Sequence, residues 1–227
     1  MPETPAVIFD LDDTLYPERD YVRSGYNAVG QLLARLTRRD EPFADWLWQR
    51  FESGQSAGAF DALSDQFHLH LDRDAISRLV QAYRNHRPQI QPRPGAVQLL
   101  DRLRHAGCRL GIISDGFLPA QQLKLDALAL ADRFDEVIFT ETLGREFWKP
   151  NPAAFEQIAQ RLNTPHAACI YVGDNPAKDF LAPNRLGWLT IQLHLPDQVH
   201  AANIPIPEGQ PQLLLHSFAQ LADSLNL

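Results

Sequence analysis

Short apolar runs alternate along the chain with longer segments whose apolar residues recur at helical spacing. The runs are rich in β-branched and aromatic residues, and they predict strands at residues 6–11, 108–114, 136–140, 168–172 and 188–193. The segments between them predict helices at residues 96–105, 119–129, 152–162 and 176–186. Gly107 and Gly187 follow two of these helices at positions typical of helix ends. Continuously apolar strands that alternate with helices indicate a parallel sheet covered on both faces.

The segment from Tyr16 to about Gln91 departs from this alternation because it contains no strand pattern. It predicts helices at residues 21–36, 42–51, 59–67 and 73–85, and the sequence QPRPG that follows them is typical of a domain boundary. We therefore expect a Rossmann-like α/β core, residues 1–15 and 93–227, interrupted by an all-helical domain, residues 16–92. A Pro-rich loop at residues 195–212 and an amphipathic helix at residues 218–227 are expected to close the chain.

Composition narrows the class of protein. A hydrophobic content of 44% and a charged content of 22% are typical of a soluble globular protein, and the net charge of −7 argues against a nucleic-acid-binding surface. No apolar run approaches the roughly 18 residues of a membrane span, and the N-terminus lacks a signal-peptide pattern. Cys108 and Cys169 each adjoin an apolar run, which indicates buried thiols rather than a disulfide. We expect a cytoplasmic protein without nucleic-acid or membrane partners; the sequence does not indicate its oligomeric state.

Chemistry-bearing residues follow four of the predicted strands. The sequence DLDDT begins at Asp10, SDG begins at Ser114, Lys149 lies beyond the third strand, and GDNPAKD ends at Asp179. Because ligands of parallel sheets bind at the carboxyl ends of the strands, these residues are expected at one edge of the sheet. Carboxylates about 4 Å apart repel by roughly 4 kcal/mol at an effective dielectric near 20. The acidic cluster that starts at Asp10 therefore requires either water or a cation.

The order and placement of these motifs resemble the haloacid dehalogenase-like superfamily of phosphohydrolases. The resemblance covers residues 6–15 and about 95–195, and the helical insertion lies where that family places its first-position (C1-type) cap domain. It implies covalent phosphoryl transfer, with Asp10 as the nucleophile that forms an aspartyl-phosphate. Asp12 would protonate the leaving group and then activate water for hydrolysis.

The resemblance also implies a Mg²⁺ cofactor, since this ion prefers oxygen ligands. The implied ligands are the carboxylates of Asp10 and Asp174 and the backbone carbonyl of Asp12, with Asp179 as an outer or alternative ligand.

Further implied roles concern the phosphoryl group. Ser114 and the backbone amides of Asp115 and Gly116 would hold its oxygens, and Lys149 would pair with both the phosphate and Asp10. Asp13 has no role in this scheme and is expected to make local structural hydrogen bonds.

Two residue patterns separate the branches of the superfamily. Asp12 favours phosphate esters, since dehalogenases lack an acid at this position, and the absence of lysine from residues 16–92 argues against a phosphonatase. A phosphosugar mutase stays open because mutases also carry this acid. A non-catalytic binding protein on the same fold is disfavoured because Asp10, Lys149 and Asp174 are all present.

The expected substrate is a small phosphate ester, such as a sugar phosphate or a nucleoside monophosphate, since a helical cap would enclose it. The segment LDDTLYP is similar to that of pyrimidine 5′-nucleotidases. Four residues that follow the nucleophile loop could reach the cleft, but cap packing or a surface position is the expected role of each: Tyr16, Arg19, Tyr21 and Arg23. Four aromatic residues of the insertion could stack a base, but their helical spacing favours core packing: Phe43, Trp46, Trp48 and Phe51.

Two other kinds of site are excluded by pattern. His68 and His70 are two residues apart and lack the neighbouring ligands of a zinc site. The sequence FDLDDT stands where a dinucleotide-binding fold would carry its glycine fingerprint after the first strand.

Overall fold

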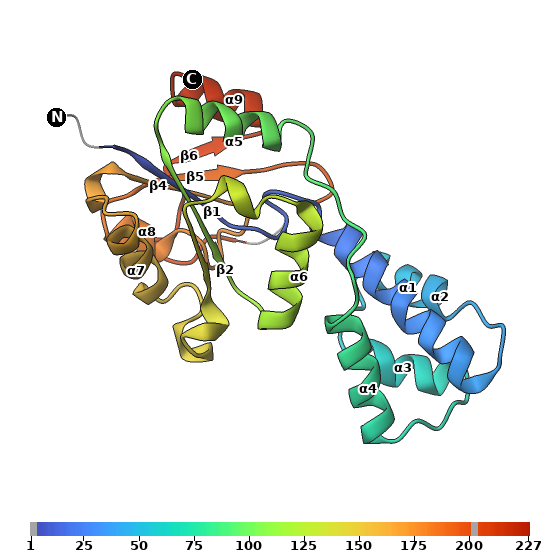
Figure 1. Ribbon diagram of the computed structural model, residues 1–227. Coiled ribbons are helices and arrows are strands. Elements are labelled where there is room, and N and C mark those ends of the chain that lie inside the picture. The colour runs from blue at the N-terminus through green and yellow to red at the C-terminus, as the bar shows by residue number, and fades with distance from the viewer. Residues whose placement is uncertain (1–3, 201–203) are drawn as a thin grey trace. The chain divides into compact units, whose positions relative to one another are not determined.

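The computed structural model describes residues 4–200 and 204–227, and the chain divides into two compact units (Figure 1). One unit comprises the residues up to Arg19 together with Gln91–Leu227, and the other comprises Asp20–Ile90. These divisions fall within a few residues of the boundaries at 16 and 92 expected from the sequence. Residues 1–3 of the predicted core and residues 201–203 of the predicted Pro-rich loop lie outside the described residues.

The first unit is built on a six-stranded parallel sheet with the order β3-β2-β1-β4-β5-β6, which confirms the predicted fold class. Its strands are β1 (Ala6–Phe9), β2 (Arg109–Ser114), β3 (Glu136–Phe139), β4 (Cys169–Gly173), β5 (Leu189–Leu193) and β6 (Leu213–Leu215). β1 lies at the centre, with Phe9 in register with Ile112 of β2 and Val172 of β4. All four residues of β1 are fully buried, as expected for a strand covered on both faces.

Helices cover both faces of the sheet. They are α5 (Ala96–His105), α6 (Leu118–Leu128), α7 (Ala153–Arg161), α8 (Leu181–Arg185) and α9 (Phe218–Ser224), with α7 and α8 on one face and α5 and α9 on the other (Figure 1). Since side chains alternate along a strand, Ile8 belongs to the same buried cluster as Phe155 of α7, whereas the ring of Phe9 lies edge-on to that of Phe134. Gly107 and Gly187 have φ of 84° and 77°, which confirms their place after the ends of α5 and α8.

One element of this unit is not predicted from the sequence, and the predicted start of another is wrong. Strand β6 is not predicted, because its three consecutive leucines follow a Pro-rich segment and show no strand periodicity. These residues form a strand because their backbone pairs with that of β5. The helix predicted at residues 176–186 begins only at Leu181. The preceding residues form turns in which the backbone NH of Asp179 donates to the Asn175 carbonyl. These turns bring the Asp179 carboxylate back to the Asn175 amide.

The second unit, Asp20–Ile90, is all-helical. Its helices are α1 (Glu18–Thr37), which begins in the first unit, α2 (Phe43–Glu52), α3 (Ala59–Gln66) and α4 (Arg73–Arg84). Phe43 lies in the core of this unit, as predicted, and its ring packs edge-on against Phe67 at 4.9 Å between centroids. Trp46, Trp48 and Phe51 pack around the same core but stay partly exposed.

Two expectations from composition concern the thiols and the membrane. Both cysteines are free, as predicted, although Cys108 is only half-buried whereas Cys169 is buried. Among the described helices, none combines the length and the apolar character needed to cross a bilayer.

Candidate active site

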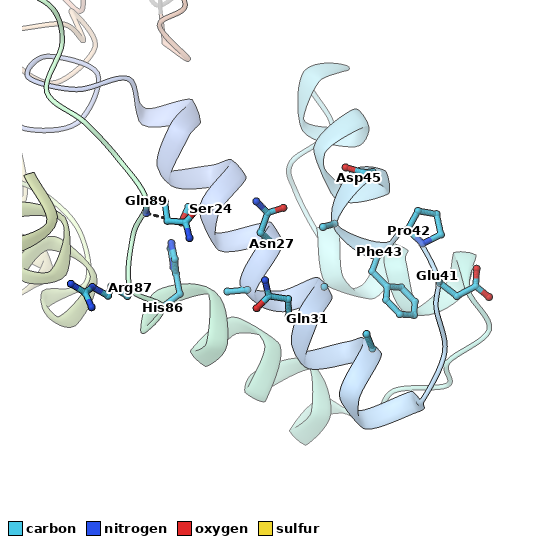
Figure 2. A pocket seen from close by; sticks show the side chains of 14 residues that line it. Ser24, Asn27, Gln31, Glu41, Pro42, Phe43, Asp45, His86, Arg87 and Gln89 are labelled. Carbon is cyan, nitrogen blue, oxygen red and sulfur yellow. Dashed lines mark hydrogen bonds between the residues drawn. The ribbon is translucent and has the colours of Figure 1, made fainter.

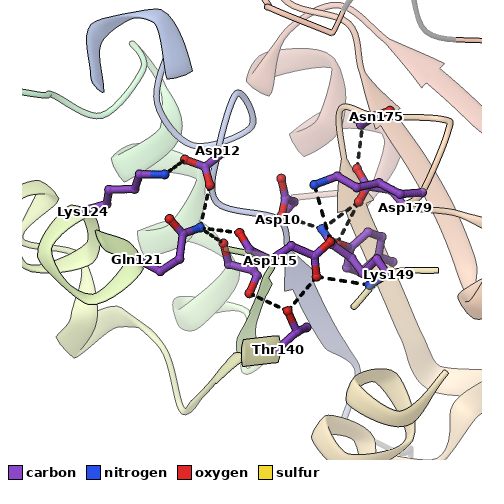
Figure 3. Close-up of polar contacts among 12 residues, drawn as sticks. Asp10, Asp12, Asp115, Gln121, Lys124, Thr140, Lys149, Asn175 and Asp179 are labelled. Atoms are coloured by element: carbon purple, nitrogen blue, oxygen red, sulfur yellow. Dashed lines mark hydrogen bonds and ion pairs between the residues drawn. The ribbon is translucent and has the colours of Figure 1, made fainter. Parts of the chain in front are cut away.

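The four sequence motifs converge at the carboxyl edge of the sheet (Figure 3). Asp10 follows β1, Ser114 ends β2, and Asp174 follows β4. Lys149 comes from the long connection between β3 and α7 and reaches the same edge. A parallel sheet brings these residues together because all its strands end on the same side.

Lys149 lies at the centre of the cluster and is fully buried. Its Nζ donates to Asp10 Oδ1 at 2.6 Å, to Asp179 Oδ1 at 2.7 Å and to the Tyr171 hydroxyl at 3.0 Å. Burial opposes the charged form, but the two carboxylates outweigh burial and raise the pKa of Lys149 well above its usual value. The lysine is therefore a fixed cation between two carboxylates.

Asp10, Asp174 and Asp179 form a compact acidic cluster in which one carboxylate oxygen of each lies within 4.8 Å of the others. The Oδ2 atoms of Asp10 and Asp174 are buried and have no hydrogen-bond partner among the residues that the structure describes. Burial raises the pKa of Asp10 to about 6 and that of Asp174 well above its usual value, and neighbouring carboxylates add to both shifts. Buried oxygens without donors fit a site for a hard cation, which would satisfy them and offset the repulsion.

Asp179 is already engaged by protein donors. One of its oxygens accepts from Lys149 and the other accepts from the backbone NH of Asn175 at 2.9 Å. Burial opposes ionisation, but Lys149 and Lys178 overcome it and lower the pKa of Asp179. Gly173 makes room for this carboxylate, because a Cβ on Gly173 would lie 2.5 Å from Asp179 Oδ2. The arrangement suits Asp179 better to an outer position than to direct ligation.

Ser114 is the last residue of β2, and Asp115 and Gly116 follow it at the same edge of the sheet. The Asp115 carboxylate accepts from the Thr140 hydroxyl at 2.8 Å and from the backbone NH of Lys149 at 3.2 Å. It thereby ties the end of β2 to the Lys149 loop. Its side chain is engaged in structure, which leaves its backbone as the part available for a ligand.

Asp12 is surrounded by three side-chain donors that the sequence did not indicate. Its Oδ1 accepts from Lys124 Nζ at 2.7 Å and from the Tyr16 hydroxyl, and its Oδ2 lies 2.6 Å from Gln121 Nε2. Burial opposes the anionic form, but Lys124, Tyr16 and Gln121 outweigh it and lower the pKa of Asp12. Packing or a surface position is the role expected for Tyr16, whereas its buried ring brings the hydroxyl to Asp12; the alternative that it reaches the site holds for this residue.

Asp13 makes structural contacts, as predicted, but the partners Val199 and Arg93 are distant along the chain rather than local. Its carboxylate accepts from the backbone NH groups of Glu18 and Val199 and pairs with the buried Arg93 at 3.4 Å. It thus anchors the loop after β1 to the segment that follows β5.

Three other residues after the first motif make structural contacts. Arg19 pairs with Asp197 at 3.2 Å, and within the helical unit Arg23 pairs with Asp45 at 2.8 Å. The Tyr21 hydroxyl donates to the Tyr83 carbonyl at 3.4 Å, also within the helical unit. These contacts agree with the packing and surface positions expected from the sequence.

A separate cavity of about 520 Å³ lies within the helical unit (Figure 2). Its lining comes from α1, the start of α2 and the segment after α4, and includes Asn27, Gln31, Glu41 and Arg87. These side chains are polar, but none belongs to the acidic cluster. Among the described residues, the acidic group compact enough for a metal ion is the one at the sheet edge.

Comparisons with known proteins agree with this geometry. The family model for haloacid dehalogenase-like hydrolases matches residues 4–187. The chain is 30% identical over 195 residues to a glyceraldehyde 3-phosphate phosphatase of Methanopyrus kandleri, with 83% of each chain covered. It is 27% identical over 202 residues to the pyrimidine 5′-nucleotidase YjjG of Escherichia coli, covering 83% of this chain and 85% of the relative.

A solved structure shows the same fold. The putative hydrolase YfnB of Bacillus subtilis, described as bound to magnesium, superposes with a TM-score of 0.70 at 21% identity, covering 99% of this chain and 100% of that one. The chain therefore belongs to the haloacid dehalogenase-like hydrolases, which confirms the predicted family and the prediction of an enzyme of its phosphatase branch.

Proposed function

We propose that this protein is a Mg²⁺-dependent phosphatase that hydrolyses a small phosphorylated metabolite through an aspartyl-phosphate on Asp10. The observation that carries the proposal is the position of Asp10. One of its oxygens lies 2.6 Å from Nζ of the buried Lys149, and the other is buried without a partner in residues 4–200 and 204–227. Lys149 fixes the carboxylate, and the acidic cluster offers a cation site directly beside it.

The proposed reaction has two steps. An oxygen of Asp10 forms a bond to phosphorus while the bond from phosphorus to the substrate oxygen breaks, and the electron pair stays on that leaving oxygen. Asp12 must enter this step in its protonated form, and it donates that proton to the leaving oxygen. Asp12 then accepts a proton from water, whose oxygen forms a bond to phosphorus while the bond from phosphorus to Asp10 breaks. The electron pair stays on the Asp10 carboxylate, inorganic phosphate leaves, and Asp12 is protonated for the next cycle.

Other residues at this edge of the sheet would bind and orient the phosphoryl group of the substrate. Ser114 and the backbone amides of Asp115 and Gly116 would hold the phosphoryl oxygens, and Lys149 would contribute positive charge to the same group. Losing a preorganised donor of this kind costs on the order of 10²–10³ in rate in comparable enzymes.

The donor set fits Mg²⁺. Asp10 and Asp174 would hold the ion through their unpartnered oxygens, together with the Asp12 carbonyl, and Asp179 would orient Lys149 and the loop after β4. When bound, the ion supplies positive charge that offsets the carboxylates and the charge on the phosphoryl group.

The proposed substrate class is a nucleoside monophosphate or a sugar phosphate. The two curated relatives act on a triose phosphate and on pyrimidine nucleotides, both small phosphate esters. We further propose that the helical unit, residues 16–92 as predicted, is the cap domain of the enzyme, and that the enzyme is cytoplasmic.

Metal removal tests the proposal. Phosphate release is measured from sugar phosphates, nucleoside monophosphates and p-nitrophenyl phosphate, with Mg²⁺ and with EDTA. We expect turnover to fall by at least about 10²-fold in EDTA and to return when Mg²⁺ is added, because the acidic cluster then loses its compensating charge. Mg²⁺ should also raise the melting temperature of wild type more than that of Asp174→Asn, since a ligand that binds the folded state stabilises it.

Two outcomes would contradict the proposal. Release that is unaffected by EDTA would exclude the cation from the reaction. No release from any compound, despite a Mg²⁺-induced rise in melting temperature, would favour the mutase alternative, which a test for isomerisation of sugar bisphosphates would then decide.

A further inference from the structure

Two polar residues lie on the buried face of α6. Gln121 and Lys124 are one helical turn apart and are 1% and 6% exposed, among apolar neighbours such as Leu125 and Leu128. An amide and an ammonium in such positions cost free energy unless each is paired. The presence of Gln121 and Lys124 on the buried face of α6 is therefore explained by the groups with which they pair.

Both residues pair with the proposed acid–base carboxylate (Figure 3). Lys124 Nζ lies 2.7 Å from Asp12 Oδ1 in an ion pair whose side chains are 7% and 15% exposed. Gln121 Nε2 lies 2.6 Å from Asp12 Oδ2 on the other side of the same carboxylate. Asp12 is thus held at both oxygens by one face of α6.

Gln121 also reaches the proposed phosphate-binding segment. Its Nε2 lies 2.6 Å from Ser114 Oγ and 2.7 Å from the Asp115 carbonyl. An amide nitrogen carries two hydrogens, so Gln121 bonds two of its three neighbouring oxygens at a time. It is the side chain that joins Asp12 to the end of β2.

Gly116, in the loop after β2, gives independent evidence that the structure accommodates the Gln121 side chain in this position. Gly116 has φ of 137°, and a Cβ there would lie 2.9 Å from Gln121 Cδ. A larger residue would displace the amide from Asp12 and Ser114. The loop after β2 therefore leaves space for Gln121 because Gly116 has no side chain.

We propose that Gln121 and Lys124 are positioning residues that hold the Asp12 carboxyl group toward the leaving oxygen of the substrate, and that Gln121 aligns Asp12 with Ser114. This inference rests on the proposed phosphatase function, since Asp12 has a leaving group to protonate only in that reaction. Neither residue is assigned contact with substrate; both act through Asp12.

The chemistry of the first step supplies a selective test. When Asp10 displaces an alkoxide, the leaving oxygen needs the proton from Asp12, whereas a p-nitrophenolate leaves readily without it. A mispositioned Asp12 should therefore impair alkyl phosphates far more than aryl phosphates. A general disturbance of the site should impair both equally.

The experiment measures kcat/KM for p-nitrophenyl phosphate and for the best alkyl phosphate of the panel, because this constant reports the steps up to release of the first product. We expect Lys124→Met to lower the value for the alkyl ester by roughly 10²-fold and that for the aryl ester by less than about threefold. Gln121→Met, which leaves the ion pair in place, should show the same selectivity with a loss of about tenfold for the alkyl ester.

Matched variants separate positioning from folding. Lys124→Arg keeps the charge and should recover most of the alkyl activity, and Gln122→Met changes an exposed neighbour on the same helix and should leave both values unchanged. In an Asp12→Ala background, Lys124→Met should cause no further loss with the alkyl ester, since its effect passes through Asp12. If Lys124→Met does not fold, Gln121→Met provides the same comparison.

Other results would overturn the inference. Equal losses with the two esters, unchanged activity in both variants, or additive losses in the Asp12→Ala background would each show that α6 does not position this carboxyl group. Wild type that releases no phosphate from either ester would refute the proposed function as well. The wild-type measurement therefore distinguishes the two failures.

Discussion

Asp10→Asn should lower phosphate release by about 10⁴–10⁶-fold, the scale seen when a covalent nucleophile is removed. Asparagine has nearly the same shape as aspartate, but its amide cannot form the acyl phosphate. The replacement also removes the negative charge that pairs with Lys149 at 2.6 Å. The measurement is the steady-state rate with a saturating aryl phosphate and Mg²⁺, so that substrate affinity does not obscure the loss.

Asp126→Asn is the matched control for this prediction, because Asp126 is exposed on α6 and its carboxylate accepts from the exposed side chain of Gln122. It should keep the wild-type rate. A rate for Asp10→Asn within about tenfold of wild type, with the variant folded, would show that Asp10 is not the nucleophile.

Lys149→Met should destabilise the metal-free protein by about 3–5 kcal/mol, because removing one partner of a buried ion pair leaves uncompensated charge. Lys149 is 0% exposed and serves two carboxylates, Asp10 at 2.6 Å and Asp179 at 2.7 Å. Methionine fills a similar volume, so the loss would come from charge and hydrogen bonds rather than from a cavity. Urea denaturation of wild type and variant in EDTA measures the free energy of unfolding.

The double variant Lys149→Met with Asp179→Asn should regain part of this loss, since one of the uncompensated charges is then absent. Mg²⁺ should restore stability to the single variant more than to wild type, because a cation beside Asp10 replaces some of the missing charge. A change below about 1 kcal/mol for Lys149→Met in EDTA would mean that the carboxylates do not depend on this lysine.

The sheet was predictable because its strands are buried on both faces. The AVIF run of β1 is apolar at every position, and the predicted strands match β1 to β5 within one or two residues. The predicted helix at residues 96–105 coincides with α5. By contrast, β6 depends on backbone pairing with β5, and the late start of α8 depends on how the Asp179 side chain folds back; neither leaves a periodic signal in the sequence.

The site was predictable where its residues directly follow strands. Parallel topology alone brings Asp10, Ser114 and Asp174 to one edge. The donors around Asp12 were missed because Gln121 and Lys124 lie 109 and 112 residues from it along the chain and belong to a helix. A signal did exist: residues 120, 121, 124, 125 and 128 share the buried stripe of α6, and two of these five are polar. Polar residues at core positions of a helix indicate a buried partner.

The most direct test of the central claim is to quench the enzyme in acid during turnover of an aryl phosphate and to measure the mass of the intact protein. We expect a fraction of the wild-type protein to carry one phosphoryl group, bound to the peptide that contains Asp10 and removed by hydroxylamine, as an acyl phosphate would be. Asp10→Asn should carry none under the same conditions. Rapid phosphate release by Asp10→Asn, or a phosphoryl group that maps to another residue, would contradict the account.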